Sequence, residues 1–295
     1  MSNHESPVLV TGASTGIGRK TVELLIQQGK EVYACARKQA DLDKLNKLEN
    51  TTAFKLDVTK PAAISSVVKA IEKQGKGLYG LVNNAGILNA GSVYTHSEEA
   101  VYEMLNINVL GPHRMTNAML PFLFKSKGRI VNISSISGIL TGQFYGLYSM
   151  SKHALEAYSD ALYQNLKEFG IGVSIIEPGN FQSSIGLNFI ERKKQEKKEL
   201  RLLMTDAQRK QQIKQIEERF GHYHDFPEPD AVAEAIYDAL YSETPKPRYL
   251  VGSRNEVEWV LKRMFVELAQ MNYNHKHSLT RKELIQLLDE VLENP

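Results

Sequence analysis

The sequence lacks three features that would each have pointed to a particular class of protein. It has one cysteine, Cys35, which excludes an intrachain disulfide and is typical of a reducing compartment. It has no run of about 18 apolar residues, the length that a transmembrane helix needs, and its short polar N-terminus does not look like a signal peptide. Its formal net charge of +2 gives no indication of a nucleic-acid partner. We therefore expect a cytoplasmic protein without a transmembrane segment and without a metal site.

Close to its N-terminus the sequence does contain a glycine-rich turn between two regular patterns. The apolar residues 8–10 are typical of a buried strand, and a helical pattern starts near residue 19. Gly12, Gly16 and Gly18 lie between them, so the turn can be tight and its backbone can approach a ligand. The free N–H groups at the helix start suit an anion such as a dinucleotide pyrophosphate. An ordinary strand-to-helix turn is the alternative interpretation of this motif alone.

Strand and helix patterns alternate over about the first 180 residues, and this alternation indicates the fold class. It predicts βαβ units in a doubly wound, Rossmann-type parallel sheet with helices on both faces. A further helix at 231–241 and a strand at 248–251 extend the pattern. The other expected strands are 8–11, 31–36, 53–56, 80–83, 129–134 and 173–177, and the other expected helices are 19–28, 41–48, 62–73, 99–124 and 149–169.

Two stretches do not follow the alternation. We expect a Rossmann-type domain over residues 1–252 with an inserted helical substrate lid at 183–226, followed by a C-terminal helical extension at 253–295. The charge run at 191–199 favours a solvated helix face over a docking site for anionic lipid or an acidic partner. In the extension, apolar spacing and a capping box of Thr280 and Glu283 predict two helices. We favour packing of these helices on their own domain over contact with a membrane or a second subunit.

Three side chains in the middle of the chain suggest proton chemistry. Tyr148 and Lys152 are four residues apart and share one face of a predicted helix. An ammonium beside a phenol favours the phenolate, so the phenol could exchange a proton with an alcohol or a carbonyl. Ser135 follows an apolar strand at the carboxyl edge of the sheet, where ligands bind and its hydroxyl could hold a substrate oxygen. Taken alone, an exposed helical pair and a hydroxyl that caps local backbone remain alternatives.

Over roughly residues 7–252 these motifs resemble the short-chain dehydrogenase/reductase family, in particular its hydroxysteroid and retinol dehydrogenase branch. The glycine-rich turn resembles the T-G-x-x-x-G-x-G loop of the family, residues 83–86 its N-N-A-G motif, and Pro178-Gly179 the P-G after its sixth strand. The resemblance implies a nicotinamide dinucleotide cofactor. It assigns to this cofactor Gly12, Ser14, Thr15, Gly16, Ile17, Gly18, Arg37, Asp57, Val58, Asn84, Ala85, Gly86, Tyr148, Lys152, Pro178, Gly179 and Ser183.

The catalytic tetrad of the family is matched in order and spacing by Asn108, Ser135, Tyr148 and Lys152. By resemblance, Tyr148 is the general acid/base and Ser135 orients the substrate oxygen. Lys152 would lower the pKa of the tyrosine and hold the nicotinamide ribose. Asn108 would anchor a water that connects Lys152 to solvent, and Ser183 would meet the nicotinamide amide.

The end of the second predicted strand indicates which dinucleotide is used. An acid at this point would bond the adenosine ribose and repel a 2′-phosphate. The sequence has Arg37 and Lys38 instead, and a guanidinium can bind a phosphate in a bidentate manner. We therefore expect NADP rather than NAD, with a solvated Arg–Lys pair as the alternative.

Apolar residues in the loops around the tetrad predict a lipophilic alcohol or ketone, steroid- or retinoid-like by resemblance, and the family implies a homodimer or homotetramer. Two other functions remain open. Tyr145 and Lys152 have the Y-x6-K spacing of related enoyl reductases, which reduce a C=C bond. A dinucleotide-sensing protein without turnover is less favoured because the tetrad is complete. The expected pocket residues are Leu88, Leu140, Phe144, Tyr145, Phe181, Ile185, Leu187 and Phe189.

Overall fold

The computed structural model describes most of the chain outside the expected lid. The described residues are 5–183, 185–186, 189, 205, 207–208, 210–211, 214–215, 218 and 225–293. The charge run at 191–199 and most of the lid expected at 183–226 lie outside them. The chain divides into two compact units, Met1–Ser253 and Arg254–Pro295, which are described separately below.

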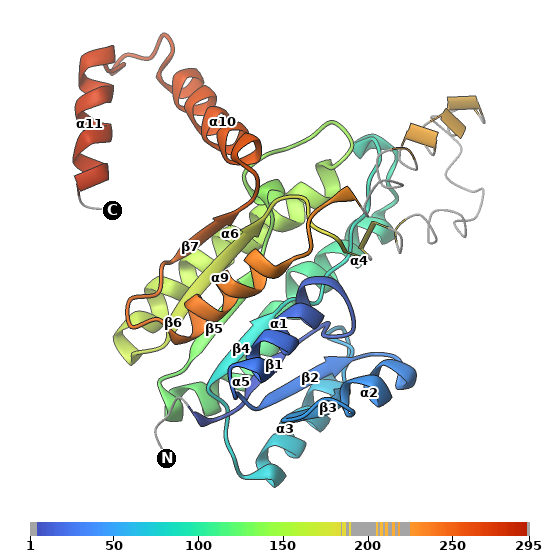
Figure 1. The fold of residues 1–295 in the computed structure, drawn as a ribbon. Coiled ribbons are helices and arrows are strands. Elements are labelled where there is room, and N and C mark those ends of the chain that lie inside the picture. Colours follow the sequence, from blue (N-terminus) through green and yellow to red (C-terminus); the bar gives the residue numbers. More distant parts are fainter. Residues whose placement is uncertain are drawn as a thin grey trace. The chain divides into compact units, whose positions relative to one another are not determined.

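Seven parallel strands form a single sheet in the first unit, in the order β3-β2-β1-β4-β5-β6-β7 (Figure 1). The order reverses between β1 and β4, and in such sheets the ligand crevice lies at the carboxyl ends of the strands at this point. The predicted doubly wound α/β fold is confirmed. The strands are β1 (Val8–Val10), β2 (Val32–Ala36), β3 (Thr51–Lys55), β4 (Gly80–Asn83), β5 (Arg129–Ile133), β6 (Gly172–Pro178) and β7 (Arg248–Val251).

The central strands are apolar because helices cover both faces of the sheet. All three residues of β1 are fully buried. Successive residues of β2 alternate between the two faces, with Ala34 in one core cluster and Cys35 in the other. Cys35 is a buried packing residue, and burial raises the pKa of its thiol.

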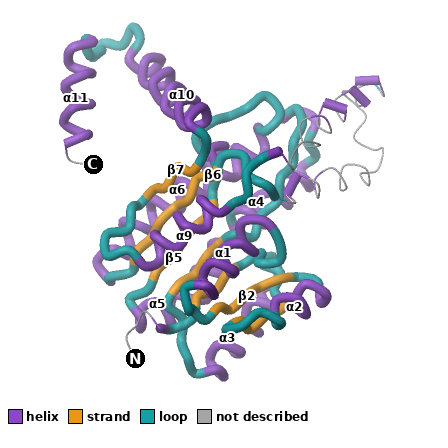
Figure 2. Tube along the Cα trace, in the orientation of Figure 1, coloured by secondary structure: helices purple, strands orange, loops and turns teal. Residues whose placement is uncertain are grey.

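Two helical layers sandwich the sheet (Figure 2). Apolar faces of α1, α2 and α9 pack on one side, and those of α3, α5 and α6 pack on the other. The bounds are α1 (Gly16–Gln27), α2 (Gln39–Leu45), α3 (Pro61–Gln74), α5 (Leu110–Ser126), α6 (Gly146–Leu166) and α9 (Asp230–Tyr241). Short 3-10 turns add η2 (Val93–Thr95), η3 (Ile136–Gly138) and η4 (Lys167–Phe169).

The single helix expected over 99–124 is in fact two helices, α4 (Glu98–Asn108) and α5, with the break at Val109. Pro112 has no N–H to donate to the carbonyl oxygen of Asn108, and it lies in the first turn of α5, where a proline costs little. Gly111 lies so close to the β3–α3 loop that a Cβ there would be 2.8 Å from Cγ2 of Val58. The break leaves Asn108 at the end of α4, where its side chain faces the site described below.

The second unit contains α10 (Arg254–Asn272) and α11 (Arg281–Glu293). The predicted capping box is confirmed: the N–H of Thr280 donates to Oε2 of Glu283 at 2.7 Å, and the N–H of Glu283 donates to Oγ1 of Thr280 at 3.3 Å. Many apolar side chains of both helices are exposed, including Trp259. Within the described part of the chain, no helix has the length and apolarity needed to cross a membrane.

Candidate active site

The turn after β1 is shaped so that only glycine fits at its key positions. Gly12 and Gly16 have φ values of +65° and +55°, in the left-handed region. A Cβ on Gly18 would lie 2.4 Å from both Nδ2 of Asn84 and the carbonyl oxygen of Gly12. Helix α1 starts at Gly16 and has no acidic residue in its first turn. This glycine cradle at a helix N-terminus fits a dinucleotide pyrophosphate.

Thr11 joins this cradle to the loop after β4, a role that the sequence analysis missed. Its Oγ1 accepts hydrogen bonds from the N–H groups of Asn84 and Ala85 at 2.9 and 3.0 Å. In return, Nδ2 of Asn84 donates to the carbonyl oxygens of Thr11 and Gly12 at 2.9 and 3.0 Å. The two loops that border the switch point are thus held together by hydrogen bonds, and the N-N-A-G motif lies against the glycine cradle.

A second missed feature is a buried polar chain that crosses the sheet. Nδ2 of Asn83 donates to Oδ1 of Asn132 at 2.9 Å, and Nδ2 of Asn132 donates to Oγ of Ser159 in α6 at 2.9 Å. These amides fix β4, β5 and α6 relative to one another. The sequence indicates this chain only through Asn132, a polar residue inside an apolar strand, since a buried amide needs hydrogen-bond partners.

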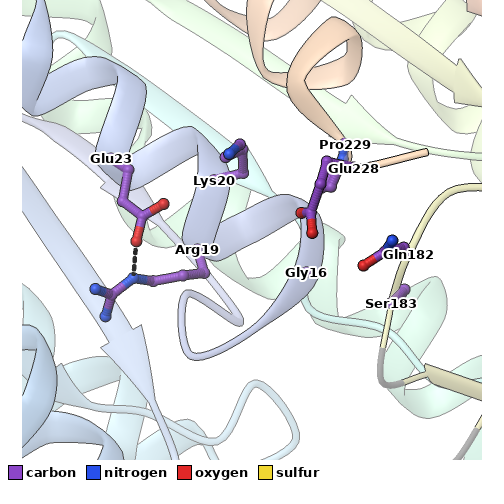
Figure 3. A pocket seen from close by; sticks show the side chains of 8 residues that line it. All are labelled: Gly16, Arg19, Lys20, Glu23, Gln182, Ser183, Glu228 and Pro229. Carbon is purple, nitrogen blue, oxygen red and sulfur yellow. Dashed lines mark hydrogen bonds and ion pairs between the residues drawn. The ribbon is translucent and has the colours of Figure 1, made fainter. Parts of the chain in front are cut away.

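A pocket of about 230 Å³ opens beside the start of α1 (Figure 3). Arg19 and Glu23 form an ion pair at 2.6 Å on its wall, and Gln182 and Ser183 face α1 from a separate segment. A Cβ on Gly16 would lie 3.3 Å from Oγ of Ser183. Ser183, expected near a nicotinamide, therefore lies beside the glycine cradle. The pocket is lined by Gly16, Arg19, Lys20, Glu23, Gln182, Ser183, Glu228 and Pro229.

The residues expected around the adenosine end lie at the ends of β2 and β3. Arg37 follows β2 and is exposed. Burial alone would raise the pKa of Asp57, but the hydroxyl and N–H of Thr59 and the charge of Arg37 hold this pKa below its ordinary value. The side chain of Val58 is part of the core, and its carbonyl accepts a bond from Arg114 at 3.4 Å. The side chain of Val58 thus serves packing.

Tyr148 lies in the first turn of α6 and is hydrogen-bonded to Ser135. Burial raises the pKa of the phenol to about 12, and the Ser135 bond opposes this shift only in part. Nζ of Lys152 lies 5.6 Å from the centre of the Tyr148 ring. Burial is the largest of the causes that shift the pKa of the phenol in this structure.

Lys152 is itself buried and charged groups around it are few. Its Nζ donates to the carbonyl oxygen of Ile133 at 2.8 Å. Burial lowers the pKa of Lys152 to about 8, and the charge of Glu156 opposes this shift. An ammonium with such a pKa is positioned to change its charge just above neutral pH.

Asn108 faces the same space. Its Oδ1 accepts from the N–H of Ile87 at 2.9 Å, and its Nδ2 donates to the carbonyl of Ile87 at 2.9 Å and to Oγ of Ser151 at 3.0 Å. A Cβ on Gly86 would lie 3.3 Å from Oδ1 of Asn108 and 3.9 Å from Nζ of Lys152. Both side chains therefore lie close to Gly86, where a larger residue would crowd them.

The end of β6 completes the site. Oγ of Ser135 donates to the carbonyl oxygen of Pro178 at 3.4 Å and accepts from the N–H of Ser137 at 3.1 Å. The N–H of Gly179 donates to the carbonyl of Val251 at 2.7 Å, so this group is used by the sheet. All four tetrad residues lie at the carboxyl ends of β4, β5 and β6 or on the helices beside them.

A small apolar cluster surrounds the phenol. Leu88, Ala90 and Phe189 form its buried centre, and Tyr145, Tyr148 and Ile185 pack against them. Four of the expected pocket residues thus meet Tyr148. Phe181 packs instead on the core beside α1 and α9, Leu140 and Phe144 are not part of the cluster, and Leu187 lies outside the described residues.

The fold and the glycine cradle are those of a dinucleotide-binding protein of the Rossmann type, and comparison with known proteins gives its family. The family model for short chain dehydrogenases matches residues 6–195. An uncharacterized oxidoreductase, YbbO, of Escherichia coli K12 is 33% identical over 262 residues, 88% of this chain and 90% of its own length. Human 17-beta-hydroxysteroid dehydrogenase type 6 is 31% identical over 277 residues, 90% of this chain and 84% of its own.

Solved structures give the same result. A short-chain dehydrogenase from Streptomyces avermitilis superposes with a TM-score of 0.75 at 28% identity, covering 92% of this chain and 96% of that one. The closed form of serine dehydrogenase complexed with NADP+ has a TM-score of 0.68 at 25% identity, covering 83% and 94%. The chain belongs to the short-chain dehydrogenase/reductase family, and it is an oxidoreductase with a nucleotide cofactor.

Proposed function

We propose that this protein interconverts a lipophilic primary or secondary alcohol, steroid- or retinoid-like, and its aldehyde or ketone with NADP(H). The observation that carries the proposal is the contact between Tyr148 and Ser135 inside an apolar cluster. A proton donor and an oxygen-binding hydroxyl side by side suit a carbonyl group, and apolar walls suit a lipophilic substrate.

The chemistry divides between the cofactor and the side chains. NADP(H), when bound, exchanges a hydride with the substrate carbon. Ser135 binds and orients the substrate oxygen, and Tyr148 gives its proton to that oxygen during carbonyl reduction. Burial raises the pKa of Tyr148 to about 12, so the phenol is protonated at neutral pH, the form that can donate a proton to a carbonyl oxygen. Lys152 supplies positive charge beside the phenolate that forms.

Arg37 supports NADP over NAD. It lies at the end of β2 without an acidic neighbour on that strand, and its exposed guanidinium is available to a 2′-phosphate. Structural relatives are complexed with NADP+ in one case and with NAD in another, so the proposal of NADP rests on Arg37. We further propose that the region 183–226 acts as a substrate lid of a domain spanning 1–252, with 253–295 as an extension, and that the protein is a cytoplasmic homodimer or homotetramer.

Oxidation of NADPH against a panel of ketones, aldehydes and enones tests this function. We expect turnover of steroid and retinoid carbonyls with NADPH, and much slower turnover with NADH. Reduction of the C=C bond of an enone, with its ketone left intact, would instead favour the enoyl reductase that the Tyr145–Lys152 spacing allows. Binding of NADPH without turnover of any substrate would favour a sensing role.

A further inference from the structure

Arg248, the first residue of β7, links carboxylates of two other elements. Its Nη1 donates to Glu156 of α6 and, at 2.7 Å, to Glu177 of β6. Its Nη2 donates to both carboxylate oxygens of Asp160 at 2.7 Å. Glu156 and Glu177 are buried, whereas Asp160 is exposed. Burial raises the pKa of Glu177 to about 7, and the charge of Glu156 acts in the same direction.

Glu156 reaches from this cluster to the rear of the active site. It lies four residues after Lys152, the spacing that places two side chains on one helix face. A Cβ on Gly138, in the turn that Ser135 starts, would lie 2.6 Å from Oε1 of Glu156 and 2.7 Å from Oγ of Ser134. One carboxylate oxygen therefore binds Arg248, and the other lies under the Ser135 turn.

We propose that Glu156, held in place by Arg248, is a positioning residue that keeps the Lys152 ammonium charged beside Tyr148. Glu156 touches neither substrate nor cofactor and acts through Lys152. The catalytic consequence rests on the proposed function, but the protonation of Lys152 does not. Glu177 binds the same guanidinium but lies on β6, whereas Glu156 and Lys152 both lie on α6.

The groups around Glu156 set the direction of the effect. On its own helix they are Lys152 and Asp160, on β6 Glu177, and on β7 Arg248. Arg248 holds the Glu156 carboxylate in an ion pair, and the negative charge of Glu156 favours the charged form of Lys152. Burial of Lys152 acts in the opposite sense. Neutralising Glu156 should therefore make Lys152 lose its proton at lower pH.

Titration of the Lys152 side chain by NMR, with 13C-labelled lysine in the whole protein and without substrate, tests this inference. The resonance of Lys152 is identified as the one that is missing from the spectrum of the Lys152→Met variant. In Glu156→Gln we expect the Lys152 titration to move down by about one pH unit, the scale of a neighbouring opposite charge. Glu177→Gln is the matched control, because it also removes a buried carboxylate from Arg248 and should leave the Lys152 titration unchanged.

Two outcomes would overturn the inference: an unchanged Lys152 titration in Glu156→Gln, or an equal shift in Glu177→Gln. Gln is isosteric with Glu, and Arg248 keeps two carboxylates in either variant. If Glu156→Gln does not fold, Glu156→Asp decides, since it retains the charge and should keep the Lys152 titration within about 0.5 unit of the original. A larger shift of the Lys152 titration in Glu156→Asp would contradict the inference that the charge of Glu156 keeps Lys152 protonated. If the original protein reduces no carbonyl, the proposed function fails while this titration remains measurable.

Discussion

The two halves of the ligand edge are built by different means. The half formed by β1 and β4 is a backbone structure, in which Gly12, Gly16 and Gly18 leave room and Thr11 ties the loops together. The half formed by β5, β6 and α6 depends on buried side chains whose proton affinities are shifted by their surroundings. The first half is suited to holding a ligand of fixed shape, and the second to moving a proton. Changes in the first should therefore affect binding, and changes in the second turnover.

The strongest test of this division is Tyr148→Phe. The variant keeps the ring and loses only the hydroxyl, so the apolar cluster remains packed. We expect kcat for carbonyl reduction to fall by roughly 10³- to 10⁴-fold, the upper range for loss of a general acid. The Kd for NADPH, measured by fluorescence titration, should change by less than about threefold.

Tyr145→Phe is the matched control for this variant. Tyr145 packs in the same apolar cluster, and the hydrogen bond to Ser135 is one that Tyr148 makes. We expect Tyr145→Phe to retain most of the reductase activity. A reversed result, with Tyr145 essential and Tyr148 dispensable, would assign the proton to the other phenol.

Gly18→Ala tests the backbone half. The added Cβ would lie 2.4 Å from two neighbouring atoms, so the cradle must open. We expect the Kd for NADPH to rise by about 10²-fold and the free energy of unfolding to fall by about 1–3 kcal/mol. Calorimetric titration and thermal unfolding measure both.

Gly75→Ala separates cradle distortion from general strain. Gly75 has φ +69°, but a Cβ there would meet nothing within 4 Å. This variant should lose about 1–2 kcal/mol of stability and bind NADPH normally. Equal loss of affinity in both variants would mean that the shape of the cradle does not control binding.

The two halves also differ in how far the sequence predicts them. The glycine turn is local, so the spacing of Gly12, Gly16 and Gly18 was sufficient to predict a strand, a cradle and a helix. The tyrosine half is assembled across elements. The order of the tetrad indicated its members, but the raised pKa of Tyr148 results from burial, which no local pattern reveals.

Long-range partners explain the remaining differences. The link from Asn83 through Asn132 to Ser159 spans three elements, and the pairing of Arg248 with Glu156 joins residues 92 positions apart in the chain. The helix expected over 99–124 is divided for a local reason, since Pro112 cannot donate a hydrogen bond back to the last turn of α4. The position of Ser183 beside Gly16 depends on how the chain returns after β6.

Arg37→Asp tests whether the side chain after β2, and not the glycine cradle alone, determines the preference for NADP over NAD. An aspartate at this point repels a 2′-phosphate and can bond ribose hydroxyls. We expect the ratio of kcat/KM for NADPH over NADH to fall by about 10- to 100-fold, the value of a charged hydrogen bond. The value of kcat at saturating cofactor should hardly change. Lys38→Ala, a neighbouring loss of positive charge, should have a smaller effect, and equal effects would point to net charge rather than a specific contact.

The pH dependence of kcat/KM should show the smallest effect and belongs to the tyrosine half. The pKa of Lys152 is lowered to about 8, so its ammonium is present below that pH and is lost as the pH rises through it. Tyr148, with its pKa near 12, stays protonated over the same interval. We therefore expect kcat/KM for reduction to be level below about pH 7.5 and to fall by up to about tenfold per pH unit above 8.

Lys152→Arg is the control, because a guanidinium keeps its charge throughout this range. Its activity, lower overall, should show no decline between pH 8 and 9. A decline that persists in Lys152→Arg would assign the titration to another group and remove Lys152 from the proton-transfer half of the site.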